Sequence, residues 1–456
     1  MTRFIKALLV PMFAWILCLN PTPLNANPYH DPELIPLDSK SLSEWAKSFQ
    51  AKSVSNSKQW AGDADVIRID LDWVQSSDSF TVSAIMRESS GTEYLQLKSL
   101  KAPAYGSYIG ILEDAAGKKR YSSIGTGQQF RKLSRGLSFR FPTVKLPAKF
   151  TLVAEDPTTG EMNENLTVPI KDGDLQSIKI QEGLDVRLIK SASSSPTIQV
   201  VTYAECFQET RREKFFESAK KVAASFMDSN LPTYKNMEIK AVFASSKENL
   251  GKPRNLGIPV PERDSFLGLY YPYWDNFGRW YNVVYPTRYQ KYRNALAQVP
   301  YDYPIAVVDS NEYWGVGNYM EITAIPSDSS SFRYLLLHEF GHFLGLNEEY
   351  EGGGRTELEF APGIVEPWSQ NITFKPAREF LKWAALVQPQ IPLPTPRSTW
   401  RDNQNGPMGA YQGGYADSAP GKSYKPGYSC IMERHSQYCA ICRRGIMDEF
   451  LRAITF

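Results

Sequence analysis

The segment from residue 338 to residue 350 constrains this chain more than any other. It reads His-Glu-Phe-Gly-His-Phe-Leu-Gly-Leu-Asn-Glu-Glu-Tyr. Residues four apart share one face of a helix, so His338 and His342 direct their imidazoles to the same point, with Glu339 beside them. A catalytic zinc site needs three protein ligands and one open position for water. The spacing therefore predicts a helix on which both histidines bind one zinc ion.

Glu339 is the expected general base, because a carboxylate beside the metal can accept the proton of the water that attacks a carbonyl. The alternative is an ordinary buried helix in which His338 and His342 are core residues. The chain has only four histidines among 456 residues, so a chance pair with this spacing and a glutamate in second place is rare. The residues favour zinc hydrolase chemistry.

The third ligand is expected among the residues after the helix. In the pattern HExxHxxGxxH it lies ten residues after the first histidine, a position that Glu348 holds here. Gly345 can end the helix and reverse the chain toward the metal, and a carboxylate is an acceptable zinc ligand. Glu348 is the first choice. Glu349 is the second, because a one-residue change in the turn would exchange the two, and His435 is the third.

Length and composition indicate a globular chain of two or three domains. The 456 residues are 42% hydrophobic and 22% charged, with a formal net charge of +2. So small a net charge gives no broad electrostatic basis for binding nucleic acid or an anionic membrane. We expect neither as a partner.

The first 26 residues have the features of a secretory signal peptide. Arg3 and Lys6 precede an apolar run from Ala7 to Leu19, and a polar stretch then ends at Ala26. The run is too short for an ordinary membrane span, and no later segment has about 18 continuous apolar residues. We expect cleavage after about Ala26, no transmembrane segment in the mature chain, and a periplasmic or extracellular location.

Four cysteines follow the expected signal peptide, which contains Cys18: Cys206, Cys430, Cys439 and Cys442. An even number in an exported protein favours disulfides, with three possible pairings. The Cys-x-x-Cys pair at 439 and 442 offers two alternatives. Together with Cys430 it suits a structural zinc site, whereas a redox pair would need a thioredoxin-like strand and helix context that the sequence lacks.

Residues 27–190 are expected to form an N-terminal β-rich accessory domain. Apolar residues alternate with polar ones in short runs separated by turn residues: 67–73, 80–86, 150–152 and 166–170. This period of two predicts a β-sandwich-like fold. Nothing in it suggests catalysis; recognition of a substrate or surface is the functional alternative to a packing role.

The Ser-rich and Pro-containing residues 191–196 are expected to be a linker, and residues 197–456 the catalytic domain. Apolar runs at 198–201, 239–243 and 305–308 predict strands, and residues 208–227 have helical periodicity. This alternation predicts a sheet with helices on its faces. The whole chain is therefore expected to be a multidomain α+β or α/β protein.

Residues 317–326 are expected to include an edge strand beside the zinc site. An extended peptide can pair with the free backbone groups of such a strand. Gly315 and Gly317 would permit another backbone to approach closely. An ordinary loop and strand is the alternative.

Several segments of the second half occur in an informative order. They are Ala204 to Phe207, Val307 to Ser310, His338 to Tyr350, Asn371 to Thr373 with Lys382 and Trp383, Gly409 to Tyr415, Cys430 to Met432, and Tyr438 to Arg443. Together they resemble the IgA-peptidase family of secreted bacterial zinc metallopeptidases. The combination of HExxH with Cys-x-Met and Cys-x-x-Cys is far more specific than HExxH alone.

The resemblance implies a metzincin-like catalytic domain with zinc-dependent endopeptidase activity and a preceding β-domain. It implies both histidines as ligands, Glu339 as base and one acidic residue of the Glu348-Glu349 pair as third ligand. Met432 would lie in the turn beneath the metal. The family usually has one more residue before its acidic pair, which aligns Glu349 with its glutamate and Glu348 with its aspartate.

The expected reaction is peptide-bond hydrolysis by a zinc-activated water, with a protein or glycoprotein as substrate. Tyr415, Tyr411 and Tyr428 are candidates for stabilising the developing oxyanion. The alternative function is that of a secreted protein- or glycan-binding protein on the same scaffold. A further alternative is an enzyme that its β-domain directs to glycoproteins such as mucins or immunoglobulins. The sequence does not determine the oligomeric state.

Overall fold

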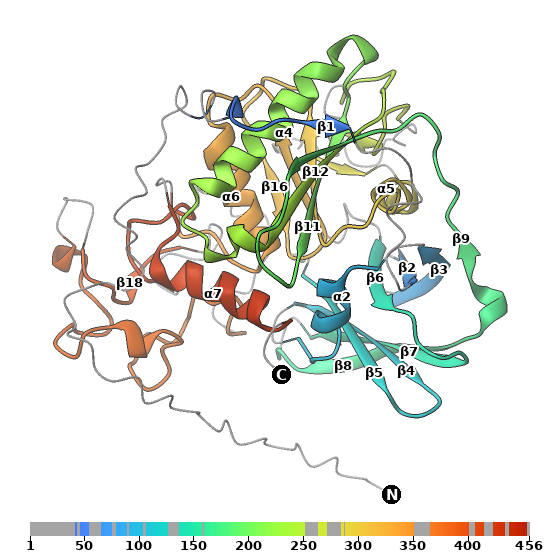
Figure 1. Cartoon of the computed structure of the whole chain (residues 1–456). Helices are drawn as coiled ribbons and strands as arrows, with labels where there is room; N and C mark the ends of the chain where they lie inside the picture. The colour runs from blue at the N-terminus through green and yellow to red at the C-terminus, as the bar shows by residue number, and fades with distance from the viewer. Residues whose placement is uncertain are drawn as a thin grey trace, which may run out of the picture. The chain divides into compact units, whose positions relative to one another are not determined.

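A computed structural model of the chain (Figure 1) describes most residues from 65 onward and a few before them. The signal-peptide region, His435 and Tyr415 lie outside the described residues. Within them, no helix is both long enough and apolar enough to cross a membrane. The described residues are 42, 46–53, 65–74, 79–88, 91–103, 106–125, 136–156, 159–250, 263–270, 284–286, 288–350, 365–400, 406–414, 423–433 and 437–453.

The structure is mixed α+β with several sheets, as the sequence predicts. The largest sheet has seven strands in the order β1-β10-β12-β11-β15-β17-β16. Strands β12, β11, β15 and β17 run parallel, while β10 and β16 pair antiparallel to their neighbours. The strands are β1 (Lys52–Ser53), β10 (Asp185–Lys190), β11 (Ile198–Glu205), β12 (Met237–Phe243), β15 (Tyr303–Val308), β16 (Val316–Asn318) and β17 (Ile322–Pro326).

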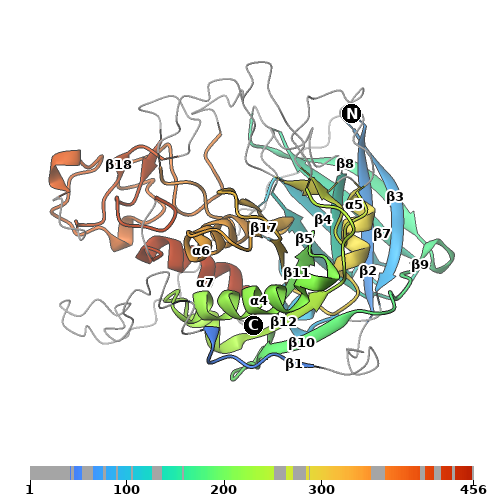
Figure 2. The ribbon, with the colours of Figure 1, turned by 90° about the horizontal axis from the view of Figure 1, so that it is seen from above.

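Helices cover both faces of this sheet because its central strands are apolar on both sides. In β11, Val200 belongs to the hydrophobic cluster on one face and Val201 to the cluster on the other. Helices α4 (Arg212–Met227), α6 (Phe332–Phe343) and α7 (Ala440–Leu451) contribute to the first cluster. Helix α5 (Tyr289–Leu296) contributes to the second. Figures 1 and 2 show α4 lying along β11 and β12.

The region before residue 180 contains two four-stranded sheets that share one hydrophobic core. Phe139 of one sheet packs on Phe150 of the other, with ring centroids 5.8 Å apart. We call these two sheets the β-module. The first contains β6 (Gly136–Pro142), β2 (Val66–Val74), β3 (Ser79–Glu88) and β9 (Gln176–Ser177). The second contains β5 (Lys119–Ile124), β4 (Tyr108–Asp114), β7 (Ala148–Glu155) and β8 (Met162–Ile170).

The seven-stranded sheet contains strands from both sides of the predicted linker. Residues 191–196 connect β10 to β11, and both strands belong to that sheet. The still earlier β1 also joins it, by pairing with β10. Serine and proline do indicate a chain connection, but turn residues carry no information about which sheet the flanking strands enter.

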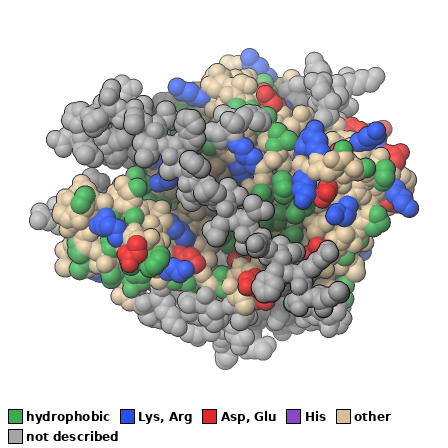
Figure 3. All heavy atoms as spheres, turned by 90° about the horizontal axis from the view of Figure 1, so that it is seen from below, with side chains coloured by type: hydrophobic (Ala, Val, Ile, Leu, Met, Phe, Trp, Pro, Cys, Tyr) green, Lys and Arg blue, Asp and Glu red, His purple; other side chains and the backbone are tan. Residues whose placement is uncertain are grey.

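Buried ion pairs join the β-module to the segment that carries α5. The Arg68 side chain is fully buried and lies 3.0 Å from both Asp70 and Glu88. It also donates to Asn294 Oδ1 of α5. Arg140 pairs with Glu88 and donates to the Tyr301 carbonyl at 2.8 Å. Figure 3 shows that basic and acidic side chains are intermixed on one outer face of the molecule.

We expect Arg68→Met to lower the free energy of unfolding by about 3–5 kcal/mol, because Asp70 and Glu88 would lose their partner while remaining buried. Arg87 is the matched control, since it is half-exposed on the same sheet and pairs with Asp172. Arg87→Met should change stability by less than about 1 kcal/mol. Chemical denaturation measures both, and equal effects would contradict the assigned weight of the buried network.

Candidate active site

The two histidines of α6 converge on one point. Their Nε2 atoms lie 3.1 Å apart. His338 Nδ1 lies 3.0 Å from the Ile431 carbonyl oxygen, and His342 Nδ1 lies 2.8 Å from the Leu346 carbonyl oxygen. A carbonyl oxygen only accepts, so each Nδ1 is the protonated nitrogen and each Nε2 presents its lone pair. Two nitrogen ligands of a tetrahedral zinc ion lie about 3.3 Å apart, so the pair fits such an ion.

The chain turns back toward the histidines after the helix. Gly345 adopts a φ of +93°, which favours glycine, and the Leu346 amide donates to the Gly341 carbonyl. The turn brings Glu348 Oε1 to 3.7 Å from His342 Nε2, with its side chain 30% exposed. Glu348 is thus an open carboxylate beside the imidazole pair.

Glu349 points elsewhere. Its side chain is fully buried, and its Oε1 lies 2.9 Å from Cys442 Sγ. Asn371 Nδ2 donates to the same carboxylate oxygen at 3.1 Å. The two neighbouring glutamates therefore have different surroundings, the imidazoles for Glu348 and the cysteines for Glu349.

Glu339 is buried beside the histidines. Burial raises the pKa of Glu339 to about 7; the nearby His342 opposes this shift and Glu348 adds to it. A general base works best with a pKa near the operating pH. The carboxylate has little room, because a Cβ on Gly315 would lie 2.3 Å from Glu339 Oε1.

Met432 lies directly beneath α6. A Cβ on Gly341 would lie 2.6 Å from Met432 Sδ, so only glycine lets the thioether pack this closely. The neighbouring Ile431 supplies the carbonyl at His338, and the Tyr438 hydroxyl donates to the Leu337 carbonyl. Residues 430–433 and 437–438 therefore form a floor under this part of α6.

Gly317 permits close approach of another backbone, as predicted, whereas Gly315 faces the side chain of Glu339. A Cβ on Gly317 would lie 2.0 Å from the Glu339 carbonyl oxygen. The backbone that Gly317 admits is therefore that of α6, whose residues contact β16. Periodicity predicted each element separately and could not reveal that helix and edge strand meet here.

The predicted oxyanion tyrosines do not gather at the histidines in the described part of the chain. Tyr411 donates to the Pro407 carbonyl and packs against Trp400 and Tyr428. The rings that stack on His338 are those of Tyr334 and Tyr350, at centroid distances of 5.3 and 5.8 Å. Tyr334 stands four residues before His338, a helical spacing that was available as a signal in the sequence.

The expected disulfides are absent, because all four described cysteines are free. Cys430 and Cys442 are nearest, with their sulfurs 3.5 Å apart, well beyond the length of an S–S bond. Cys206 belongs to the hydrophobic cluster on the opposite face of the sheet. An even number of cysteines in the sequence cannot reveal that Cys206 lies apart from the others. It also cannot reveal that Glu349 lies beside Cys430, Cys439 and Cys442.

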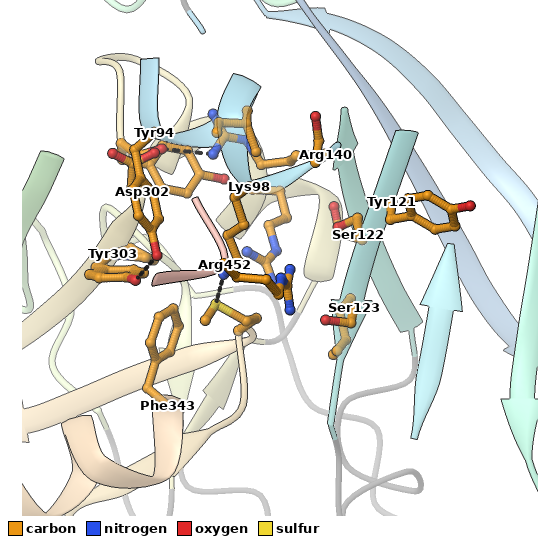
Figure 4. Close-up of a pocket in the computed structure, with 18 residues that line it drawn as sticks. Tyr94, Lys98, Tyr121, Ser122, Ser123, Arg140, Asp302, Tyr303, Phe343 and Arg452 are labelled. Atoms are coloured by element: carbon orange, nitrogen blue, oxygen red, sulfur yellow. Dashed lines mark hydrogen bonds between the residues drawn. The ribbon is translucent and has the colours of Figure 1, made fainter. Parts of the chain in front are cut away.

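A small cavity of about 70 Å³ lies between the β-module and the seven-stranded sheet. Figure 4 shows that Lys98, Arg140, Asp302 and Arg452 line it. Lys98 pairs with Glu449 at 2.5 Å, and burial lowers the pKa of Lys98 to about 8. These charges pair with groups of the protein itself and brace the two parts of the structure.

A helix that presents two imidazoles and a glutamate in this arrangement is typical of HExxH peptidases. The family model described as IgA Peptidase M64 matches residues 186–406 and 400–450, more than half of the chain. The chain therefore belongs to the IgA peptidase M64 family, and its activity is that of a peptidase, which hydrolyses peptide bonds in a protein substrate. No curated protein matches the chain. The family match begins within β10, before the predicted linker.

We expect Gly317→Ala to lower the free energy of unfolding by about 1–3 kcal/mol, because the added methyl would meet the α6 backbone rather than a flexible side chain. Peptidase activity should fall with it, since Glu339 is the residue displaced. Gly173→Ala is the control, because a Cβ there meets nothing within 4 Å. Denaturation and casein cleavage measure the two effects; an unaltered Gly317→Ala protein would contradict the close packing.

Proposed function

We propose that the chain is an exported zinc endopeptidase with a metzincin-like catalytic domain. His338, His342 and Glu348 hold one zinc ion, and Glu339 is the general base. The observation that carries the proposal is the convergence of two Nε2 lone pairs 3.1 Å apart, each oriented by a backbone carbonyl on its Nδ1.

The donor set suits zinc, which accepts imidazole nitrogen and carboxylate oxygen. When bound, the ion would polarise the substrate carbonyl and make water more acidic. Glu348 supplies the negative charge among the ligands, and its partial exposure leaves the site open to solvent. Met432 packs under Gly341, and the Ile431 carbonyl orients the His338 imidazole.

Glu339 moves the proton in this proposal. Its carboxylate accepts a proton from the attacking water and donates it to the leaving amine. The raised pKa of Glu339 favours both steps near neutral pH, because the group then gains and loses a proton readily. Close packing of Gly315 against the carboxylate keeps it in one position.

Substrate binding is assigned to β16, the last strand in the order of the large sheet. An extended peptide that pairs with an edge strand lies along it and presents its carbonyls at regular intervals. The β-sandwich-like accessory domain expected at residues 27–190 would then add a recognition surface for glycoproteins. These assignments rest on the order of the strands and on the two-sheet core of the β-module.

We expect Glu339→Gln to lower kcat/KM by about 10²–10⁴, because the amide cannot accept the proton. Bound zinc should stay at the wild-type level, since both histidines remain. Glu217→Gln, an exposed change on α4, is the matched control. Cleavage of casein and of a glycoprotein panel, together with metal analysis, measures these effects. A wild-type protein that binds zinc and cleaves nothing would instead support the alternative of a binding protein.

Glu348 and Glu349 provide a second comparison. We expect Glu348→Gln to weaken zinc binding at the histidines by more than about 100-fold, because it removes a ligand rather than an outer partner. Glu349→Gln should leave a histidine-bound zinc ion, since this side chain faces the cysteines. Metal titration followed by X-ray absorption distinguishes the two. Wild-type affinity in the Glu348→Gln protein would refute its role as a ligand.

A further inference from the structure

We propose that Glu349, Cys430, Cys439 and Cys442 form a second metal site, a closed structural zinc site separate from the histidine pair. One carboxylate oxygen and three sulfurs lie within 4.8 Å of one another. Four donors drawn together in this way match the coordination number of structural zinc. This second site does not depend on the proposed peptidase mechanism, because none of its four residues takes part in that mechanism.

The distances within the cluster fit a common central ion. Cys442 Sγ lies 3.5 Å from Cys430 Sγ and 2.9 Å from Glu349 Oε1, and Cys439 Sγ lies 4.0 Å from the same oxygen. Two sulfurs bound to one tetrahedral zinc ion lie about 3.8 Å apart, given Zn–S bonds of about 2.3 Å. The 3.5 Å between Cys430 Sγ and Cys442 Sγ is close to this value, so these two side chains would need only small shifts to bind one ion.

A buried carboxylate without a full set of partners is suited to binding a cation. The Glu349 side chain is fully buried, and its Oε2 has no hydrogen-bond partner among the described residues. Leaving such an oxygen unsatisfied costs free energy. The three cysteines do not remove this cost by pairing, because any one disulfide leaves an odd thiol beside the carboxylate.

The backbone around the cysteines is arranged to support thiolates. The Cys439 amide lies 3.3 Å from Cys430 Sγ, and the Cys442 amide lies 3.5 Å from Cys439 Sγ. Cys439 is also the N-cap of α7, where the helix dipole favours negative charge. Thiolate-rich donor sets select zinc over magnesium or calcium. Cys430 and Cys442 are buried while Cys439 is partly exposed, which leaves one side for metal entry.

The cluster also connects two parts of the proposed active site. Glu349 directly follows Glu348, and its amide donates to the Met432 carbonyl at 2.9 Å. Cys430 directly precedes Ile431, whose carbonyl orients His338. A metal ion bound to Glu349 and Cys430 would therefore fix the turn that carries Glu348 and the floor beneath the imidazoles. We assign these four residues a positioning role.

The test uses the full-length chain with His338→Ala and His342→Ala, which removes the histidine pair and leaves the cysteine cluster intact. We expect about one zinc ion per chain to remain after gel filtration. X-ray absorption at the zinc edge should show mainly sulfur neighbours at about 2.3 Å. Absence of zinc, or zinc with only nitrogen and oxygen neighbours, would overturn the proposal. Failure of the peptidase proposal would leave this result unchanged.

Thiol titration of the wild-type protein separates zinc from a disulfide. With zinc bound, all four described cysteines should react after denaturation with a chelator present and no reductant. A loss of two thiols would identify a disulfide and overturn the proposal. Cys439→Ser should lower the zinc content by about one ion per chain, and Cys206→Ser, the matched control, should not.

Glu349→Gln adds a measurement that does not depend on removing a thiol. The amide is of similar size but is a far weaker ligand, so zinc should be lost to a competing chelator at least about 10-fold faster from Glu349→Gln than from wild type. Glu433→Gln is its control, because Glu433 shares the Lys425 ammonium with the Glu349 carbonyl but is not one of the four clustered donors. Equal rates in both variants would overturn the assignment of Glu349.

Discussion

The hydrogen bond between His338 and the Ile431 carbonyl joins two segments of the chain that are 93 residues apart. One segment is helix α6, which carries both histidines, and the other is a short turn with almost no regular structure. The bond sets the tautomer of the imidazole and, through Met432 and Gly341, the distance between helix and turn. Most of the geometry described for the site depends on that distance.

The opposite side of α6 is constrained just as closely. Gly317 brings the strand β16 against the backbone of the helix, and Gly315 lies against the Glu339 side chain. A site held from both sides loses little entropy when a substrate binds, because its reacting groups are already in place. The site therefore tolerates little substitution at these glycines, because an added methyl group would lie too close to neighbouring atoms.

Sequence periodicity predicted the parts of the site that lie on one element. His338, Glu339 and His342 follow from the helical repeat alone, and the buried strands of the sheet follow from continuous apolar runs. Glu348 and Glu349 are adjacent in a turn, yet Glu348 lies near the His342 imidazole and Glu349 near the Cys442 thiol. Their directions depend on these tertiary neighbours, which the local sequence does not show. The cysteine cluster, the Arg68 network and the contact of β16 with α6 all join residues far apart in sequence, where no local repeat carries information.

The antiparallel strand β10 has a consequence for any attempt to isolate the peptidase region. It covers the outer edge of β12, a strand whose residues are almost all buried. A polypeptide that started at residue 197, after the apparent linker, would expose this apolar edge with its backbone donors and acceptors unpaired. Such edges recruit strands from other molecules. The strand before the linker therefore keeps this edge of the sheet from pairing with another molecule.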